Sequence, residues 1–220
     1  MAETRTLPPR RSALLSALKP GTFGTLGSDG PGSAGPGSDG PGSDGPGVTL
    51  SERHPMSVVQ VEGRIGQEAA LGDALETAIG IHPADGFNRV SGDEDGPRIL
   101  WVGPCRWYVA EPESRDLYGA LRPAMGKFGG ATVDLSSGRT VFRLSGHDAR
   151  RVLAKGCSLD THSSTFGPGA CCQTGLFHVS VLIACVDEAP TYEIYAARGY
   201  ALSLWESLVD ASMEYGLRVD

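Results

Sequence analysis

The sequence predicts an α+β domain in which helices pack on a mostly antiparallel sheet. Three observations carry this prediction. Short runs rich in β-branched residues are bounded by turn signals, as in strands. Other segments place apolar residues at helical spacing. The 220 residues are 40% hydrophobic and 7% aromatic, which is ordinary for a globular protein with a core.

The N-terminal quarter of the chain has a different composition. Residues 27–46 are four copies of a five-residue unit, GSDGP or GSAGP, without large apolar side chains. Such a tract cannot offset its ordering entropy by burial, and its period of five excludes a collagen helix. We therefore predict a disordered tail over residues 1–55, with a linker at 27–47, and a folded domain over 56–220. Deleting residues 1–47 should then leave assembly intact.

The first half of the expected domain mixes strands and helices. Residues 57–62 alternate valines with polar residues and predict a strand, and residues 68–79 carry Leu71, Leu75 and Ile79 at helical spacing. A second helix is predicted over 114–128, with Ser114 as its N-cap. Three short strands are predicted at 87–90, 99–102 and 107–110.

The second half should contain a hairpin, two helices and further strands. The hairpin pairs residues 132–135 with 140–144, and Gly138 supplies the positive φ of its turn. A helix follows from Gly146 through Leu153, with Asp148 in its first turn, where a carboxylate favours the helix dipole. Residues 171–186 should turn back on themselves, and residues 191–196 should form the last strand.

The final predicted helix, residues 199–215, is apolar over roughly 200° of its circumference, wider than the ~100° stripe of an ordinary surface helix. A helix of this kind is covered on two sides. One side belongs to its own sheet, and a partner chain can cover the other. We therefore expect the isolated chain to be poorly soluble or to self-associate.

Charge and composition exclude several classes of protein. A net charge of −7 argues against a nucleic-acid partner, because phosphate binding requires a basic surface. No apolar run approaches the ~20 residues of a membrane span, and the stretch Ala13–Leu18 is too short for a signal peptide. Five cysteines without regular spacing indicate reduced thiols. We expect a cytoplasmic protein.

The sequence contains no motif for a dinucleotide, a P-loop or a catalytic serine, so we predict no catalytic or cofactor-binding residues. Thiols and imidazoles that can bind zinc are present at Cys157, His162, Cys171, Cys172 and His178. They lack the paired C-x₂₋₄-C spacing, and neighbours on a strand point to opposite faces. Structural thiols are the favoured interpretation, and no metal site is predicted.

Two further groups of polar residues have ordinary explanations. His147 and His162 can act as general bases, but each also suits the end of an element. The cluster Arg139, Arg143, Arg150 and Arg151 can clamp a carboxylate or a phosphate, or can pair with acids of this chain or of a partner.

Residues 133–153, VDLSSGRTVFRLSGHDARRVL, resemble the folate-binding aminomethyltransferase fold of the glycine-cleavage T-protein. With LWVGPCRWYVA, AKGCSLDTH, FGPGACCQTGLFHVSVL and PTYEIYAARGYALSLWESLVDASMEYG, the chain resembles the gamma subunit family of heterotetrameric sarcosine oxidase over residues 56–216. Two places depart from the family pattern, residues 161–164 and Gly199-Tyr200. These departures put the partner and the substrate in doubt.

The resemblance implies an accessory subunit that holds no cofactor itself. The other subunits of the complex, alpha, beta and delta, would carry FAD, FMN, NAD, tetrahydrofolate and zinc. The complex would oxidise sarcosine to glycine, form peroxide and pass a one-carbon unit to tetrahydrofolate. An alternative is a stand-alone folate-binding aminomethyltransferase-like protein. The partner interface is predicted at seven residues, namely Arg139, Asp160, His162, Phe166, Gln173, His178 and Trp205.

Overall fold

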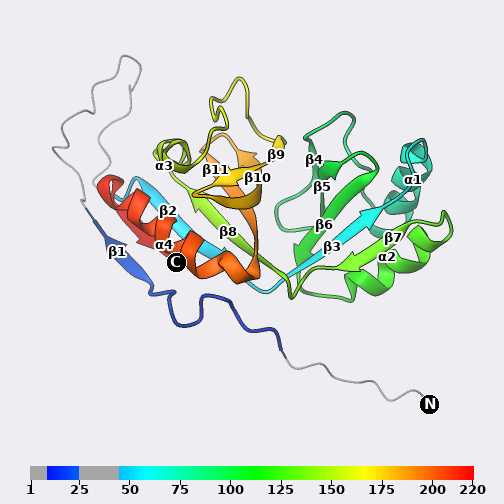
Figure 1. Cartoon of the computed structure of the whole chain (residues 1–220), viewed down its shortest axis with the longest axis horizontal. Coiled ribbons are helices and arrows are strands. Elements are labelled where there is room, and N and C mark those ends of the chain that lie inside the picture. Colours follow the sequence, from blue (N-terminus) through cyan, green and yellow to red (C-terminus); the bar gives the residue numbers. More distant parts are fainter. Residues whose placement is uncertain (1–8, 25–44) are drawn as a thin grey trace.

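A computed structural model describes residues 9–24 and 45–220 of the chain. The described residues form two β-sheets (Figure 1). The larger sheet contains, in spatial order, β1 (Gly21–Phe23), β12 (Leu217–Val219), β2 (Val48–Arg53), β8 (Arg139–Ser145), β11 (Thr191–Ala197), β10 (Val179–Asp187) and β9 (Cys171–Leu176). The smaller contains β4 (Val90–Gly92), β5 (Arg98–Gly103), β6 (Arg106–Pro112), β3 (Met56–Glu62) and β7 (Ala131–Asp134). Of the named strands, only β12 and β2 pair in parallel, so the predicted α+β class with mostly antiparallel strands is confirmed.

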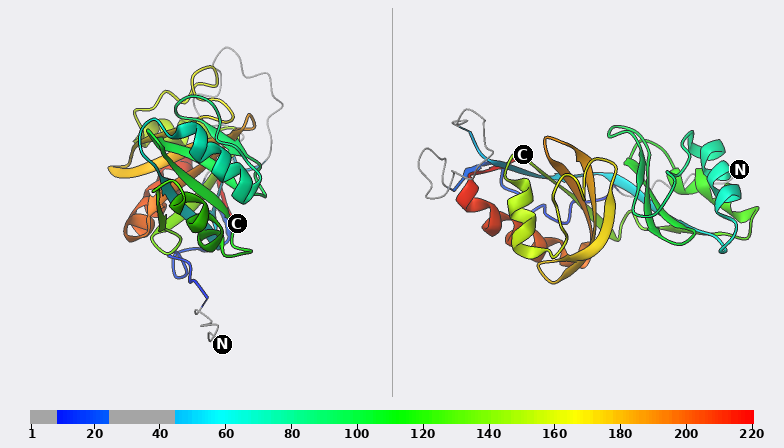
Figure 2. Two further views of the ribbon diagram at one scale, coloured as in Figure 1. Left: turned by 90° about the vertical axis from the view of Figure 1, so that its right-hand side faces the viewer. Right: turned by 90° about the horizontal axis from the view of Figure 1, so that it is seen from above.

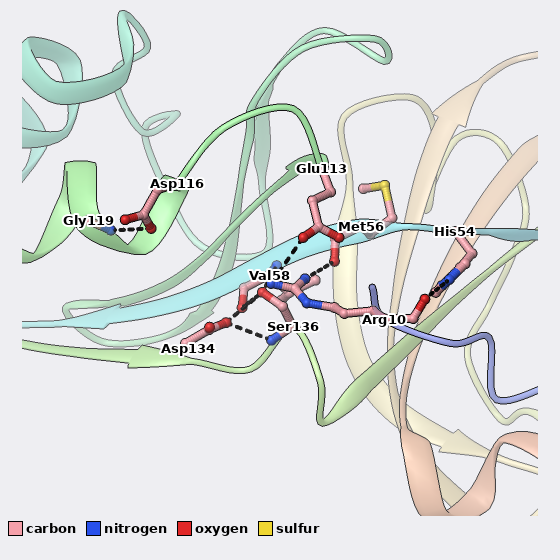
Figure 3. Close-up of polar contacts among 9 residues, drawn as sticks. All are labelled: Arg10, His54, Met56, Val58, Glu113, Asp116, Gly119, Asp134 and Ser136. Atoms are coloured by element: carbon pink, nitrogen blue, oxygen red, sulfur yellow. Dashed lines mark hydrogen bonds and ion pairs between the residues drawn. The ribbon is translucent and has the colours of Figure 1, made fainter. Parts of the chain in front are cut away.

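Helices α1 (Glu68–Ile79) and α2 (Leu117–Gly126) pack on the five-stranded sheet. The predicted helix at 68–79 is confirmed: Leu71, Leu75 and Ile79 are buried one turn apart, and Gly80 ends the helix in the left-handed conformation. Helix α2 begins later than predicted. Its N-cap is Asp116, whose carboxylate accepts a hydrogen bond from the Gly119 amide at 2.8 Å (Figure 3), so the assignment of Ser114 as N-cap is wrong.

Helices α3 (Ala149–Gly156) and α4 (Ala201–Ser212) pack on the seven-stranded sheet. Short 3₁₀ turns, Arg198–Tyr200 and Met213–Tyr215, flank α4. Within this core Phe142 of β8 packs against Trp205 of α4, and their ring centroids lie 6.0 Å apart. The two halves, each a sheet with its pair of helices, lie next to each other along the long axis of the molecule (Figures 1 and 2).

The sheets also contact each other directly. Val58, Leu100 and Ala110 of the smaller sheet share a buried cluster with Leu182 and Tyr195 of the larger. The helices therefore cover the outer faces, and the inner faces of the two sheets meet. The single sheet with helices on one side that the sequence indicated is replaced by this two-sheet arrangement.

The predicted hairpin over residues 132–144 is wrong. Strand β7 pairs with β3 in one sheet, whereas β8 pairs with β2 and β11 in the other. The turn between them crosses from sheet to sheet, and the Ser136 hydroxyl oxygen accepts a hydrogen bond from the Val58 amide at 3.0 Å (Figure 3). Gly138 does not adopt a positive φ. Local turn signals placed a turn correctly but could not identify the pairing partner of each strand.

The tail predicted as disordered over 1–55 is partly folded. Strand β2 lies inside the larger sheet, β1 pairs with β12, and Leu14 is fully buried in the core between them and α4. Arg10 donates to the Met56 carbonyl at 3.0 Å and lies 3.6 Å from the Glu113 carboxylate (Figure 3). The boundary at residue 56 is therefore wrong, because β2 and the segment around Leu14 bury apolar side chains. Most of the GSDGP tract lies outside the described residues.

Several element bounds differ from the prediction by a few residues. The strand expected at 87–90 is found at Val90–Gly92, and α3 begins at Ala149 rather than Gly146. The reversal expected within 171–186 is confirmed as the β9–β10 hairpin. Among the helices of the described residues, none combines the length and the apolar character that crossing a membrane requires.

Candidate functional site

A hollow with a volume of about 520 Å³ lies between the two sheets and is lined by residues of both. We call it the inter-sheet groove. One wall is Tyr108 of β6, and the other is built by the β9–β10 hairpin, β8, β11 and the turn before α4. The lining residues are Tyr108, Arg139, Gln173, Thr174, His178, Val179, Ser180, Val181, Leu182, Tyr195, Ala197 and Tyr200.

Arg139 is the permanent charge of the inter-sheet groove. It begins β8, and its Nη2 donates a hydrogen bond to the Tyr108 hydroxyl at 2.9 Å. The guanidinium carbon lies 5.7 Å from the centre of the Tyr108 ring, within cation–π range. In the parts of the chain that the structure describes, no carboxylate forms an ion pair with Arg139. Two other arginines of the predicted cluster form ion pairs, Arg143 with Glu94 and Arg151 with Asp148. The third, Arg150, donates to the Thr161 carbonyl at 3.1 Å.

His178 reaches the groove from the tight turn between β9 and β10. Phe177 and His178 are the two central residues of this turn, and both have positive φ, 47° and 68°. Two left-handed residues give the turn the twist of its strands, although glycine or asparagine usually occupies such positions. Helix α3 supports the strained turn, because the Phe177 amide donates to the Gly156 carbonyl at 2.9 Å. The backbone that carries the exposed His178 is thus held in a defined place.

Beneath the groove lies a buried charge cluster between the sheets. Glu193 of β11 has no exposed surface and forms ion pairs with Arg53 and Arg98, while Arg143 lies 3.7 Å away. The Tyr195 hydroxyl donates to Glu193 at 2.8 Å. Burial raises the pKa of Tyr195 and lowers the pKa of Arg98. Sequence reasoning missed this cluster, whose only signal was a lone glutamate within the run Thr191–Ala196.

The structure gathers three of the seven predicted interface residues in one place. Arg139, Gln173 and His178 all line the inter-sheet groove, although Arg139 of β8 lies far before the β9–β10 hairpin that carries the other two. Gln173 also bridges the two sheets, because its amide nitrogen donates to the Val102 carbonyl. Tyr108 and Tyr200, which complete the rim, were not predicted, because nothing local in the sequence relates them to Arg139.

The other four predicted residues lie outside the groove. Asp160 and His162 are exposed on the loop before β9; the Asp160 carboxylate accepts from the His162 amide at 2.9 Å, which lowers the pKa of Asp160. Phe166 is buried and stacks on Tyr192 with centroids 6.3 Å apart. Trp205 is also buried, 3% exposed, against the chain's own core. Both aromatic side chains are therefore covered by this chain, while Asp160 and His162 remain available to a partner.

The larger sheet separates the cysteines that were considered as zinc ligands. Cys171 belongs to the cluster between the sheets, whereas Cys157 and Cys172 pack on the helical side. In residues 9–24 and 45–220, no group of three or more histidine, cysteine, aspartate or glutamate side chains has an arrangement that could hold a metal ion. Burial raises the pKa of Cys171 to about 12, as for an inert structural thiol.

The fold is similar to part of an aminomethyltransferase. Glycine cleavage system aminomethyltransferase T from Bartonella henselae superposes with a TM-score of 0.57 at 18% identity, over 80% of this chain and 48% of that one. At this identity the similarity concerns the fold alone.

A narrower assignment follows from sequence. Residues 65–214 match the model of the sarcosine oxidase, gamma subunit family, and the chain belongs to that family. It is 32% identical to sarcosine oxidase subunit gamma of Corynebacterium sp. (strain U-96) over 142 residues, which are 64% of this chain and 69% of the relative. The Arthrobacter sp. subunit gamma is 35% identical over 59% of this chain and 60% of its own length. A chain of the heterotetrameric sarcosine oxidase from Corynebacterium sp. U-96 superposes with a TM-score of 0.70 at 28% identity, over 76% of this chain and 85% of that one.

Proposed function

We propose that this chain is the accessory gamma subunit of a heterotetrameric sarcosine oxidase, which converts sarcosine to glycine and forms peroxide. The family match over residues 65–214 carries the proposal. We further propose that its partners are the alpha, beta and delta subunits, and that those subunits hold FAD, FMN, NAD, tetrahydrofolate and zinc. The complex would act in the cytoplasm.

The surface around α4 supports a role inside a complex. Four large apolar side chains in this region are more than one third exposed, namely Phe23, Tyr200, Leu202 and Met213. Large apolar side chains exposed in one region of a surface are a feature of protein interaction sites. Trp205, at the centre of the same helix, is buried by the chain's own sheet. The apolar arc of the last helix therefore divides into an inner side and an outer side, as the sequence indicated.

The stand-alone aminomethyltransferase-like alternative has less support. The chain spans 48% of the aminomethyltransferase that shares its fold, whereas it spans 85% of the matching chain of the heterotetrameric oxidase.

Omission of the chain tests the proposal. The alpha, beta and delta subunits of the same host should be expressed together with and without this chain, and sarcosine-dependent peroxide should be measured in both preparations. We expect the preparation without this chain to lose soluble complex, and with it most of the peroxide signal. Equal yield and equal activity in the two preparations would refute the accessory role.

A further inference from the structure

The inter-sheet groove carries positive charge on an acidic protein. The chain has a formal net charge of −7, yet the lining of the groove contains one arginine, one histidine and no carboxylate. Its other polar groups are the Gln173 amide and the hydroxyls of tyrosine, serine and threonine. A concave site of this composition attracts a negatively charged group.

The guanidinium of Arg139 is positioned to bind a negatively charged group. Only its Nη2 is engaged, by the Tyr108 hydroxyl, and Nε and Nη1 have no hydrogen-bond partner in residues 9–24 and 45–220. The contact with the Tyr108 ring holds the guanidinium in place. A planar fork of donors with a fixed orientation fits a carboxylate through two parallel hydrogen bonds and loses little entropy on binding.

Exposed apolar side chains occur at the groove and just after it along the chain. Tyr200 lines the groove and is 59% exposed, and Leu202, two residues further on, is 48% exposed. A small molecule in the groove would leave this apolar surface in water. A protein partner would cover both, with the charged contact in the hollow and apolar contacts around it. Tyrosine and arginine are the residue types that most often dominate binding at such interfaces.

We propose that the inter-sheet groove is a socket for an acidic side chain of a partner subunit. An aspartate or glutamate carboxylate of the partner binds Arg139, and the adjoining partner segment packs against Tyr200 and lies beside His178. The inference rests on the proposed function, because it requires a partner subunit, and it identifies where on this chain that partner is held.

Charge reversal in the intact complex tests the socket. Tagged chain is expressed with alpha, beta and delta as wild type, Arg139→Glu, Arg139→Lys or Tyr200→Ser, and the partner recovered with the tag is quantified. Arg139→Glu should lower recovery about tenfold or more, because it places two like charges together. Arg139→Lys should lower it less, since a point charge keeps the attraction but loses the fork. Arg122→Glu, an exposed change on α2, is the matched control and should leave recovery unchanged.

Tyr200→Ser provides a second test that does not depend on the folding of Arg139→Glu. The exposed Tyr200 ring contributes little to the core, so this variant should fold normally. Recovery should fall several-fold with a melting temperature equal to that of the wild type. A photo-reactive benzoylphenylalanine at position 200 should cross-link a partner peptide that contains aspartate or glutamate close to the cross-link. A peptide without a nearby acid would overturn the proposal.

The outcomes separate this inference from the proposed function. If the wild type recovers no partner, the proposed function fails and the socket fails with it. If wild type and Arg139→Glu recover partner equally, the socket alone is refuted. Were acetate or glutarate also to raise the melting temperature of the wild type but not of Arg139→Glu, the groove would be a small-molecule site, and the socket would again be refuted.

Discussion

Replacing Leu14 with alanine tests whether the N-terminal segment is part of the fold. The Leu14 side chain is fully buried among residues of β2, β12 and α4, although the sequence around it was expected to be disordered. The change removes three side-chain carbons, worth about 2.4 kcal/mol at ~0.8 kcal/mol per buried carbon, and the residual cavity adds to this. We expect Leu14→Ala to lower the free energy of unfolding by about 3 kcal/mol.

Urea denaturation followed by circular dichroism measures this loss, and a thermal melt should show a decrease of roughly 6–12 °C for a chain of this size. Leu15→Ala is the matched control, because Leu15 is 71% exposed and its truncation should change stability by less than about 0.5 kcal/mol. If the two variants denature alike, Leu14 is not docked, and the inclusion of residues 9–24 in the fold is refuted.

Three further predictions follow from the structure. Glu193→Ala should destabilise the chain by about 3–5 kcal/mol in urea titration, because it leaves buried arginines unpaired; a loss below about 1 kcal/mol would contradict the inter-sheet cluster. Gly146→Ala should lower the free energy of unfolding by more than about 1 kcal/mol, because Gly146 has a φ of 110° and a Cβ there would lie 2.3 Å from the Gly47 carbonyl oxygen. Gly175→Ala is the control, because a Cβ at position 175 meets no atom within 4 Å. At pH 8 a thiol reagent should modify the half-buried Cys157 well before Cys171, because a pKa of about 12 leaves Cys171 with almost no thiolate. Rapid labelling of Cys171 in the folded chain would contradict the buried position of this thiol.

Local sequence signals predicted the helices well. Helix α1 was predicted to the residue, because three apolar residues one turn apart and a terminal glycine determine both its face and its end. The start of α2 was missed by three residues, since Ser114 and Asp116 are both good N-cap residues and only the fold selects between them.

The pairing of strands that are distant along the chain could not be predicted from the sequence. The segment from Thr132 to Leu144 has the pattern of a hairpin, yet its two strands belong to different sheets. Likewise, β2 directly follows the low-complexity tract, and we extended the disorder predicted for that tract over a strand that lies inside the larger sheet. In both cases the information lies in partners distant along the chain.

The candidate site was predicted in part. Arg139, Gln173 and His178 were predicted to contact a partner, and the fold brings them to one groove. Periodicity alone could not have placed them together, because Arg139 lies far before the other two along the chain. Tyr108 and Tyr200 were missed for the same reason. Phe166 and Trp205 were predicted at the interface but are buried in the chain's own core. An aromatic residue is common in both places, and the sequence does not show which neighbours will cover it.

Membership of an oxidase complex is the central claim, and purification of the tagged chain from its native host tests it most directly. The eluate should contain further chains, show flavin absorbance and form peroxide when sarcosine is added. A colourless eluate with this chain alone, and no sarcosine-dependent peroxide, would contradict the account.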